Sequence, residues 1–260
     1  YESTIRFSGA KPIPIPLREQ NGFAFSAEEV LSKINERTRL IILNSPANPT
    51  GGVVPRGEFD ALIEGLCEWP EVAIMSDEIY GQMLYDNREH VSLIRYPEII
   101  ERLILLDGWS KTYAMTGWRL GYSVWPEKVA PHAEKLCVNI HSCVNSSAQF
   151  AGIAALTGDQ SPVKAMVSAF DERRTVIIDE LNKIPGFSCI QPGGAFYAFP
   201  NITQTGLQSD ELQKKILEEA GVAVISGTSF GEYGEGYLRF SYANSTENIL
   251  KAVDLIRECL

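Results

Sequence analysis

Residues 103–121 read LILLDGWSKTYAMTGWRLG, a short apolar run followed at once by polar and small residues. Two similar apolar runs precede it, at residues 40–43 and 72–75. The three runs begin at residues 40, 72 and 103, and a spacing of about 30 residues is typical of a strand followed by a crossover helix. Because continuous apolar runs suit strands that are covered on both faces, the pattern predicts the parallel sheet of an α/β domain.

Polar residues follow each of the three predicted strands. Asn44 and Ser45 come after the first strand, Ser76 and Asp77 end the second, and Asp107 ends the third. In open parallel sheets, ligands bind just beyond the carboxyl ends of the strands. The sequence therefore predicts a ligand site at this edge of the sheet.

Composition narrows the class of protein. The 260 residues are 45% apolar and 22% charged, which predicts a globular chain with one large domain, or with a core and a smaller satellite domain. The net charge is -10 and no run of Lys or Arg occurs, so we expect neither a nucleic-acid partner nor an anionic membrane. Five scattered cysteines without a Cys-x-x-Cys pair indicate free thiols, no metal framework and a cytoplasmic location.

The pattern changes near Ser161-Pro162, which is typical of a helix start. Apolar residues at helical spacing predict one long helix that ends before Pro185-Gly186. Short strands at 187–191, 196–199 and 237–241 and helices at 210–220 and 246–259 are predicted beyond it, an α+β pattern. We therefore predict a large domain over residues 1–161 and a small C-terminal domain over residues 162–260.

Three short motifs carry candidate chemistry. The loop Asn48-Pro49-Thr50-Gly51 is rigid enough to hold the Asn48 amide in place, Asp77 and Tyr80 lie at a strand end, and Lys111 lies beyond a buried strand. A desolvated lysine is a weaker base and can form a Schiff base with a carbonyl group. Taken singly, the Asn48 loop is equally compatible with an ordinary loop, and an acidic strand end is a common feature. A lone lysine at such a place is more typical of a surface residue.

Together these motifs resemble the class I/II aminotransferases, which are fold-type I enzymes that use pyridoxal 5'-phosphate (PLP). The matching residues, in the family's order, are Asn48-Pro49-Thr50-Gly51, Asp77-x-x-Tyr80, Ser110-Lys111 with Gly117-x-Arg119-x-Gly121, and Arg239 in Tyr237-Leu238-Arg239-Phe240-Ser241. The resemblance covers the whole chain and is greatest to the aspartate-aminotransferase-like subgroup. It implies the fold-type I architecture, with a partial, mainly parallel-sheet large domain and a smaller α+β domain.

The resemblance also implies the reaction, which moves an amino group between an amino acid and a 2-oxo acid. Lys111 would bind PLP as a Schiff base and then carry the proton between the substrate and the cofactor. Asp77 would pair with the pyridine nitrogen, and Tyr80 would hydrogen-bond the oxygen on the ring. These three residues are the catalytic residues that the resemblance implies.

Four further residues complete the site that the resemblance implies. Asn48 would contact the cofactor and the substrate, and Arg239 would bind the substrate α-carboxylate. Arg119 would bind the cofactor phosphate. Ser110 is also placed among the cofactor-binding residues, although Gly108 occupies the position where many relatives have a phosphate-binding serine.

The resemblance begins partway through the family's large domain, so the loop that cradles the phosphate and the aromatic residue that stacks on the ring would lie upstream of Tyr1. We therefore expect a fragment that binds PLP weakly and turns over slowly or not at all. An exposed sheet edge and apolar surface are expected to make it self-associate, and relatives imply a homodimer.

Two alternatives to an aminotransferase stay open. One is a PLP-dependent lyase of the same fold, and the other is a catalytically inert fragment. His90, His132 and His141 lack the spacing of metal ligands and are interpreted as surface or helix residues. Residues 193–197 resemble a family segment on the substrate side of the site, but a plain turn is equally compatible with them.

Overall fold

The computed structural model describes residues 1–260 and divides the chain into two compact units. The unit formed by Ser26–Ala47 and Val54–Ser168 contains a four-stranded sheet and is called the four-stranded unit. The unit formed by Tyr1–Phe25, Asn48–Val53 and Ala169–Leu260 contains a three-stranded sheet and is called the three-stranded unit. No helix is long and apolar enough to cross a membrane.

The four-stranded unit is built on a mainly parallel sheet. Its strands are β1 (Leu40–Asn44), β2 (Ala73–Asp77), β3 (Leu103–Gly108) and β4 (Gly121–Val124), in that spatial order. The first three pair in parallel and β4 runs antiparallel to β3. The parallel sheet predicted from the three apolar runs is therefore confirmed, and it places Asn44, Asp77 and Leu106 side by side in register.

The two connections between the parallel strands differ in kind. Helix α3 (Arg56–Leu66) joins β1 to β2, as the strand spacing predicts. Between β2 and β3 there is no α-helix, only the 3-10 turns η2 (Leu93–Arg95) and η3 (Pro97–Arg102), so the spacing is misleading there. Asp86 and Asn87 both adopt positive φ angles, which interrupt any regular helix in this connection.

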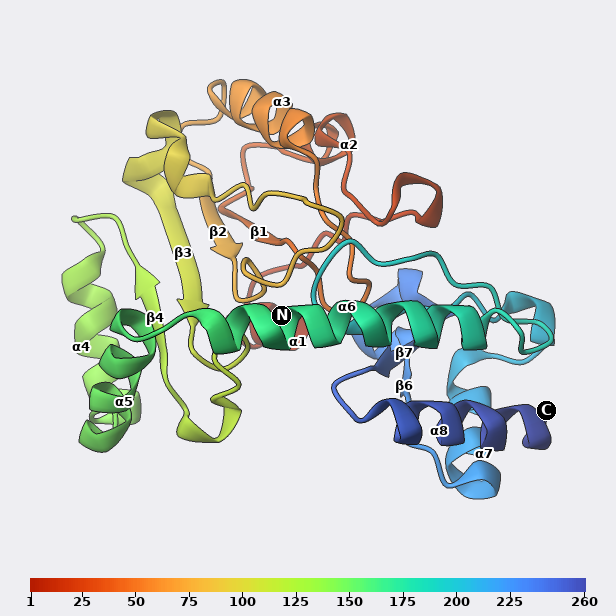
Figure 1. Ribbon diagram of the computed structural model, residues 1–260. Helices are drawn as coiled ribbons and strands as arrows, with labels where there is room; N and C mark the ends of the chain where they lie inside the picture. The colour runs from red at the N-terminus through yellow and green to blue at the C-terminus, as the bar shows by residue number, and fades with distance from the viewer. The chain divides into compact units, whose positions relative to one another are not determined.

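The core of this unit lies between the sheet and two helices. Helix α3 buries Phe59, Leu62, Ile63 and Leu66, and α2 (Ala27–Ser32) packs next to it (Figure 1). Ser26 caps α2 by accepting a hydrogen bond from the Glu29 amide at 3.4 Å, as its capping-box sequence predicts. Apolar burial of this kind fixes the strands whose carboxyl ends carry the candidate residues.

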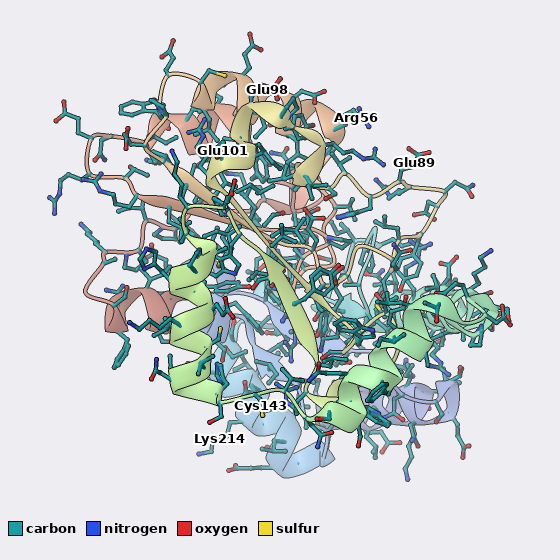
Figure 2. The ribbon with its side chains drawn as sticks, turned by 90° about the vertical axis from the view of Figure 1, so that its left-hand side faces the viewer. Arg56, Glu89, Glu98, Glu101, Cys143 and Lys214 are labelled. Carbon is teal, nitrogen blue, oxygen red and sulfur yellow. The ribbon has the colours of Figure 1, made fainter.

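Strand β4 and the two helices after it expose much apolar surface. All four residues of β4 are exposed, and this strand forms one edge of the sheet. Helix α4 (Ala130–His141) buries no residue, and α5 (Ser146–Thr157) buries only Ala148 and Gly152. The turn that joins α4 to α5 carries Cys143 (Figure 2).

The three-stranded unit has an antiparallel sheet in the order β5 (Tyr197–Ala198), β7 (Leu238–Ser241), β6 (Ile225–Ser226). Its helices are α1 (Glu2–Phe7), α7 (Ser209–Ala220) and α8 (Thr246–Cys259), together with the end of α6 (Ser161–Leu181). The strand predicted at 187–191 is absent, because Ser188 makes only an isolated bridge to Asn201.

The two units differ from the predicted division into residues 1–161 and 162–260. The change of unit falls inside α6, between Ser168 and Ala169, and Tyr1–Phe25 and Asn48–Val53 group with the C-terminal residues. The loop at 48–53 does so because its backbone pairs with the Gly193-Gly194 turn. Contacts of this kind join distant segments and leave no local pattern in the sequence.

Candidate active site

Asp77 is held at the carboxyl end of β2 by its neighbours on both sides. The Asn44 side-chain amide donates to the Asp77 carbonyl oxygen at 2.9 Å, from the adjacent strand β1. The Glu78 amide donates to Leu106 O of β3 at 2.9 Å, so the ladder continues past the strand end. The Asp77 carboxylate accepts a hydrogen bond from the Ile79 amide at 3.3 Å, so the carboxylate is held against the first residues of the loop after β2.

Tyr80 and Lys111 lie next to each other in the four-stranded unit. Tyr80 follows β2 and is only 3% exposed. Lys111 follows β3, and its Nζ lies 5.8 Å from the centroid of the Tyr80 ring. The two loops after neighbouring parallel strands thus bring a primary amine to a buried phenol, close to the strand end that carries Asp77.

The backbone around Lys111 is tightly hydrogen-bonded. Trp109 donates its backbone amide to Leu120 O at 3.2 Å and its indole N–H to Gly152 O of α5 at 3.0 Å. The Ala114 amide donates to Lys111 O at 3.1 Å, and Ala114 has a φ of 52°. The loop is therefore hydrogen-bonded both to the residue before β4 and to α5, which fixes where the lysine leaves the backbone.

Arg119 and Ser110 belong to the same loop but lie apart from these contacts. Arg119 is exposed, has a φ of 54°, and donates from Nη1 to Thr116 O at 3.0 Å, within its own turn. Ser110 is partly exposed. At Gly108, a Cβ would lie 2.8 Å from Gly121 Cα, so the close approach of β3 and β4 leaves no room for a serine side chain there.

The three-stranded unit holds the other two predicted residues, Asn48 and Arg239. Arg239, on the central strand β7, donates from Nη1 to Asn48 Oδ1 at 2.9 Å. Its guanidinium carbon lies 4.7 Å from the Tyr197 ring centroid and 5.0 Å from that of Phe230. Two aromatic rings and one amide thus orient the fork, a geometry suited to binding a carboxylate.

The loop that carries Asn48 is anchored on the glycine turn at 193–194. Gly51 O accepts hydrogen bonds from the Gly193 and Gly194 amides, each at 3.0 Å. Gly51 has a φ of 66°, and a Cβ there would lie 2.4 Å from Pro192 Cβ. The Asn48-Pro49 bond is cis. The predicted rigidity of this loop therefore comes from contacts with a distant segment as well as from its own prolines and glycines.

Two acidic groups beside these strands differ in their surroundings. Burial raises the pKa of Asp107 above its usual range, although its carboxylate accepts from the Gly108 amide and the Tyr122 hydroxyl. Burial alone would also raise the pKa of Glu78, but hydrogen bonds from His90 and Ser92 outweigh burial and lower it. Glu78 is therefore the carboxyl that holds its negative charge more firmly.

Sequence reasoning missed the contacts of Phe230, Glu78 and His90 that this geometry brings forward, whereas Tyr197 belongs to the 193–197 segment that it interpreted as either a substrate-side segment or a plain turn. Tyr197 and Phe230 flank Arg239, and Glu78 bonds to His90, whose side chain is 22% exposed. The interpretation of His90 as an ordinary surface or helix residue is wrong, since it lies in a loop with its ring on a buried carboxylate. Glu78, directly after Asp77, carried a local signal, whereas the contacts of Phe230 and His90 depend on residues distant in the chain.

The side chains of the four-stranded unit fit PLP by their chemistry. Asp77 provides a carboxylate for a ring nitrogen, Tyr80 a hydroxyl for a ring oxygen, and Lys111 a primary amine for an aldehyde. No group of three or more His, Cys, Asp or Glu side chains is placed to hold a metal ion.

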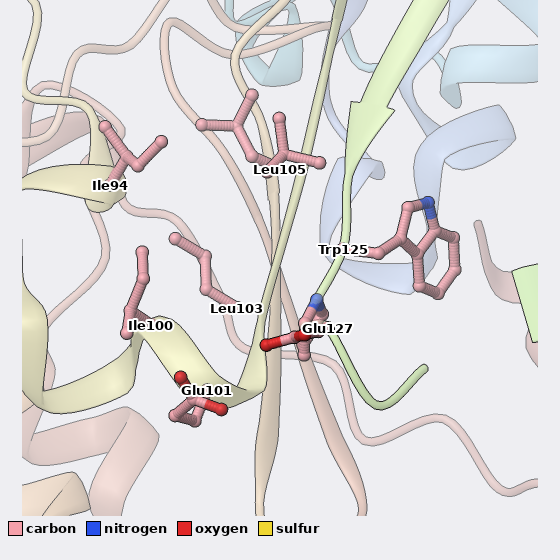
Figure 3. A pocket seen from close by; sticks show the side chains of 9 residues that line it. Ile94, Ile100, Glu101, Leu103, Leu105, Trp125 and Glu127 are labelled. Carbon is pink, nitrogen blue, oxygen red and sulfur yellow. The ribbon is translucent and has the colours of Figure 1, made fainter. Parts of the chain in front are cut away.

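A separate small cavity, of about 130 Å³, lies beside β3 and β4 (Figure 3). Apolar side chains dominate its lining, among them Ile94, Ile100, Leu103 and Leu105. Leu103 begins β3, so the cavity lies toward the end of that strand opposite the Lys111 loop. None of the seven predicted site residues lines it.

Comparison with known proteins gives a consistent result over the whole chain. The family model described as aminotransferase class I and II matches residues 1–256. The chain is 40% identical to an aspartate aminotransferase of Pyrococcus horikoshii, over 100% of this chain and 66% of that protein. It is 38% identical to an aspartate aminotransferase of Geobacillus stearothermophilus, over 98% of this chain and 66% of that protein.

Solved structures agree in fold. The aromatic aminotransferase from Pyrococcus horikoshii matches with a TM-score of 0.94 and 34% identity, covering 99% of this chain and 69% of that one. The aspartate aminotransferase from Thermus thermophilus with maleate matches with a TM-score of 0.91 and 33% identity, covering 100% of this chain and 67% of that one.

The chain spans about 66% of the length of the curated relatives named above. Within that span, the family model covers both units, and the fold is that of fold-type I PLP-dependent transferases, as the sequence predicts. The chain therefore belongs to the class I and II aminotransferases, because the family model matches residues 1–256.

Proposed function

We propose that this protein is a PLP-dependent aminotransferase that moves an amino group from an amino acid to a 2-oxo acid. The observation that carries the proposal is the placement of Lys111 Nζ 5.8 Å from the Tyr80 ring, at the end of the sheet that presents Asp77. Family membership and the names of the relatives support the same reaction.

The residues of the four-stranded unit would divide the work at the cofactor. When bound, PLP supplies an electron sink that stabilises negative charge at the substrate α-carbon. Asp77 would keep the ring nitrogen protonated, because its carboxylate is held at a fixed strand end. Tyr80 would donate to the ring oxygen. Nζ of Lys111 would accept the proton from the substrate α-carbon and then donate it to the cofactor, so that Lys111 acts first as a base and then as an acid.

The residues of the three-stranded unit would bind the substrate. Arg239 would take the α-carboxylate in a bidentate pair, for which the flanking rings of Tyr197 and Phe230 set the plane of the fork. Asn48, whose amide oxygen accepts a hydrogen bond from Arg239, would contact the cofactor and the substrate. We propose Arg119 and Ser110 as the residues of this chain that contact the phosphate.

We also propose a homodimer, supported by the apolar side chains that α4 and α5 leave exposed. Five free cysteines support a reducing, cytoplasmic location.

The test is reductive trapping. The chain is incubated with excess PLP, reduced with borohydride and digested, and the modified peptide is identified by mass. We expect a PLP adduct on Lys111, its loss in Lys111→Arg, and its retention in Lys135→Arg, a matched change at an exposed lysine of α4. An unmodified Lys111 would support an inert chain.

A half-reaction then separates the two kinds of enzyme. An amino acid added to the PLP-loaded protein should leave stoichiometric pyridoxamine phosphate and a 2-oxo acid. Release of ammonia without pyridoxamine phosphate would instead identify a lyase.

A further inference from the structure

Glu78 is a buried carboxylate that lies between the two residues proposed to hold the cofactor ring, Asp77 and Tyr80. It is 5% exposed. Its Oε1 accepts from Ser76 Oγ at 2.9 Å and from the Leu93 amide at 3.0 Å. Several donors thus converge on one side chain, which is what a buried charge requires.

His90 completes this set of donors from a segment outside the turn. Its Nε2 lies 2.7 Å from Glu78 Oε2. Because an ionised carboxylate can only accept, the imidazole N–H is the donor. The connection between β2 and β3 has no α-helix, so this bond and the Leu93 amide tie residues 90–93 back to the end of β2.

The imidazole also contacts the backbone of the same turn. A Cβ at Gly81 would lie 3.0 Å from both Cδ2 and Nε2 of His90. The Gly81 amide donates to Glu78 O at 2.7 Å, and the Met83 amide donates to Tyr80 O at 2.8 Å. The ring of His90 therefore bonds to the turn at Glu78 and lies close to it at Gly81, with Tyr80 between these two positions.

Neighbouring residues at a strand end point to opposite faces of the sheet. Glu78 continues the ladder through its bond to Leu106 O, so fixing its side chain on one face fixes the side chain of Asp77 toward the other. Tyr80, two residues further on, is carried by the same turn. The orientation of both cofactor-binding side chains thus depends on the anchoring of Glu78.

We propose that Glu78 and His90 are a positioning pair that holds the turn of residues 77–81 in the geometry needed to bind the cofactor. The proposal rests on the proposed function, because it takes Asp77 and Tyr80 as the residues that hold PLP. Neither member of the pair is a catalytic residue; both act through Asp77 and Tyr80.

Three variants separate positioning from simple stability. His90→Ala removes the donor, His90→Gln keeps an N–H donor at a similar reach, and His132→Gln is the matched change at an exposed histidine of α4. Ile99→Val serves as a fourth variant, because it weakens the core of the same unit by about 0.5–1.5 kcal/mol at a buried residue of η3, outside residues 77–81.

The first measurement is amide hydrogen exchange of the protein without cofactor. In His90→Ala we expect exchange of the Ile79, Gly81 and Met83 amides to rise about tenfold or more, since a hydrogen bond to a charged group contributes at least that factor. His90→Gln should restore most of the protection. Peptides of α7 and α8 should not change in either variant, and Ile99→Val should not change the turn selectively.

The second measurement is the apparent Kd for PLP, read from the yield of borohydride-trapped Lys111 at increasing PLP. His90→Ala should weaken binding about 10–100-fold, the range found when groups that orient metal ligands are removed. His90→Gln should recover most of the affinity, and His132→Gln and Ile99→Val should match the unmodified protein.

The outcomes are distinct. Unchanged turn exchange and PLP affinity in His90→Ala would overturn the positioning pair while leaving the proposed function intact. Failure of the unmodified protein to form a Lys111 adduct would refute the proposed function, and the exchange data would still show whether His90 holds the turn. If His90→Ala does not fold, His90→Gln decides the question. Wild-type exchange and wild-type PLP affinity in His90→Gln would support the positioning pair. Loss of PLP affinity in His90→Gln without a change in exchange of the turn would overturn the positioning pair.

Discussion

Two carboxyl groups at the ends of adjacent strands respond to folding in opposite ways. The pKa of Glu78 is lowered because His90, Ser92 and the Leu93 amide outweigh its burial, and that of Asp107 is raised because burial outweighs its hydrogen bonds. The number and kind of donors at each carboxylate decides the sign. A single residue type next to a strand therefore says little about its charge state until the donors are known.

The raised pKa of Asp107 predicts a pH-dependent change in stability. Because the folded protein holds the Asp107 proton more tightly than the unfolded chain, ionised Asp107 disfavours folding at neutral pH, and this disadvantage fades as pH falls through the raised pKa. The melting temperature of Asp107→Asn minus that of the unmodified protein should therefore become more positive as pH rises from 4 to 8. Calorimetry across that range measures the difference.

Asp159→Asn provides a control of opposite sign. Hydrogen bonds from Ser161 lower the pKa of Asp159, so its ionised form favours folding, and the variant should lose stability relative to the unmodified protein as pH rises. A difference for Asp107→Asn that is flat or falls with pH would contradict the assignment of burial as the dominant cause.

At the scale of elements, the loop that carries Asn48 depends on one glycine. Gly51 combines a φ of 66° with backbone bonds to the Gly193 and Gly194 amides and has no room for a Cβ. The sequence predicts a rigid turn from its prolines and glycines. The segment on which the turn is anchored could not be predicted, because residues 193–194 are remote in sequence and carry no pairing signal.

Gly51→Ala should destabilise the protein strongly. The left-handed backbone alone costs about 1–3 kcal/mol for a residue other than glycine, and the collision with Pro192 adds to that cost. Urea unfolding should show the loss. Gly57→Ala is the matched control: Gly57 lies in the first turn of α3, a Cβ there would meet open space, and the variant should keep or slightly raise the stability.

If Gly51→Ala unfolded at the same urea concentration as the unmodified protein, the loop would have to leave the 193–194 turn at no cost. That result would contradict the anchoring described for Asn48. It would also remove the structural reason for the orientation of the Asn48 amide toward Arg239.

At the scale of the whole molecule, apolar surface is concentrated on two helices. Exposed apolar side chains on α4 and α5 are more than half accessible: Leu136, Val138, Ile140, Phe150, Ile153 and Leu156. Exposed apolar side chains that form a contiguous patch mark an interaction site or cause association, and these two helices carry six of them. The sequence predicts self-association of the chain, and the structure identifies α4 and α5 as the helices expected to mediate it.

We therefore expect concentration-dependent self-association in sedimentation velocity. The double variant Ile140→Lys and Phe150→Lys should shift the protein toward the monomer, because it places charges on the most exposed apolar positions of α4 and α5. Leu217→Lys is the control, since Leu217 is 52% exposed but lies on α7. Equal effects of the two changes, or a monomer at all concentrations without either, would contradict the role of these helices.

The amino-acid sequence by itself determined the features that follow from local rules. Apolar runs with polar ends specify three parallel strands, capping residues specify where α2 begins, and the order of the strands places Asp77 and the loop that carries Lys111 after neighbouring strands. Only the tertiary structure decided the His90–Glu78 bond, the rings around Arg239 and the grouping of residues 48–53 with the C-terminal unit. The reason is that each of these depends on side chains from segments distant in the chain, whose approach is set by the packing of the whole fold.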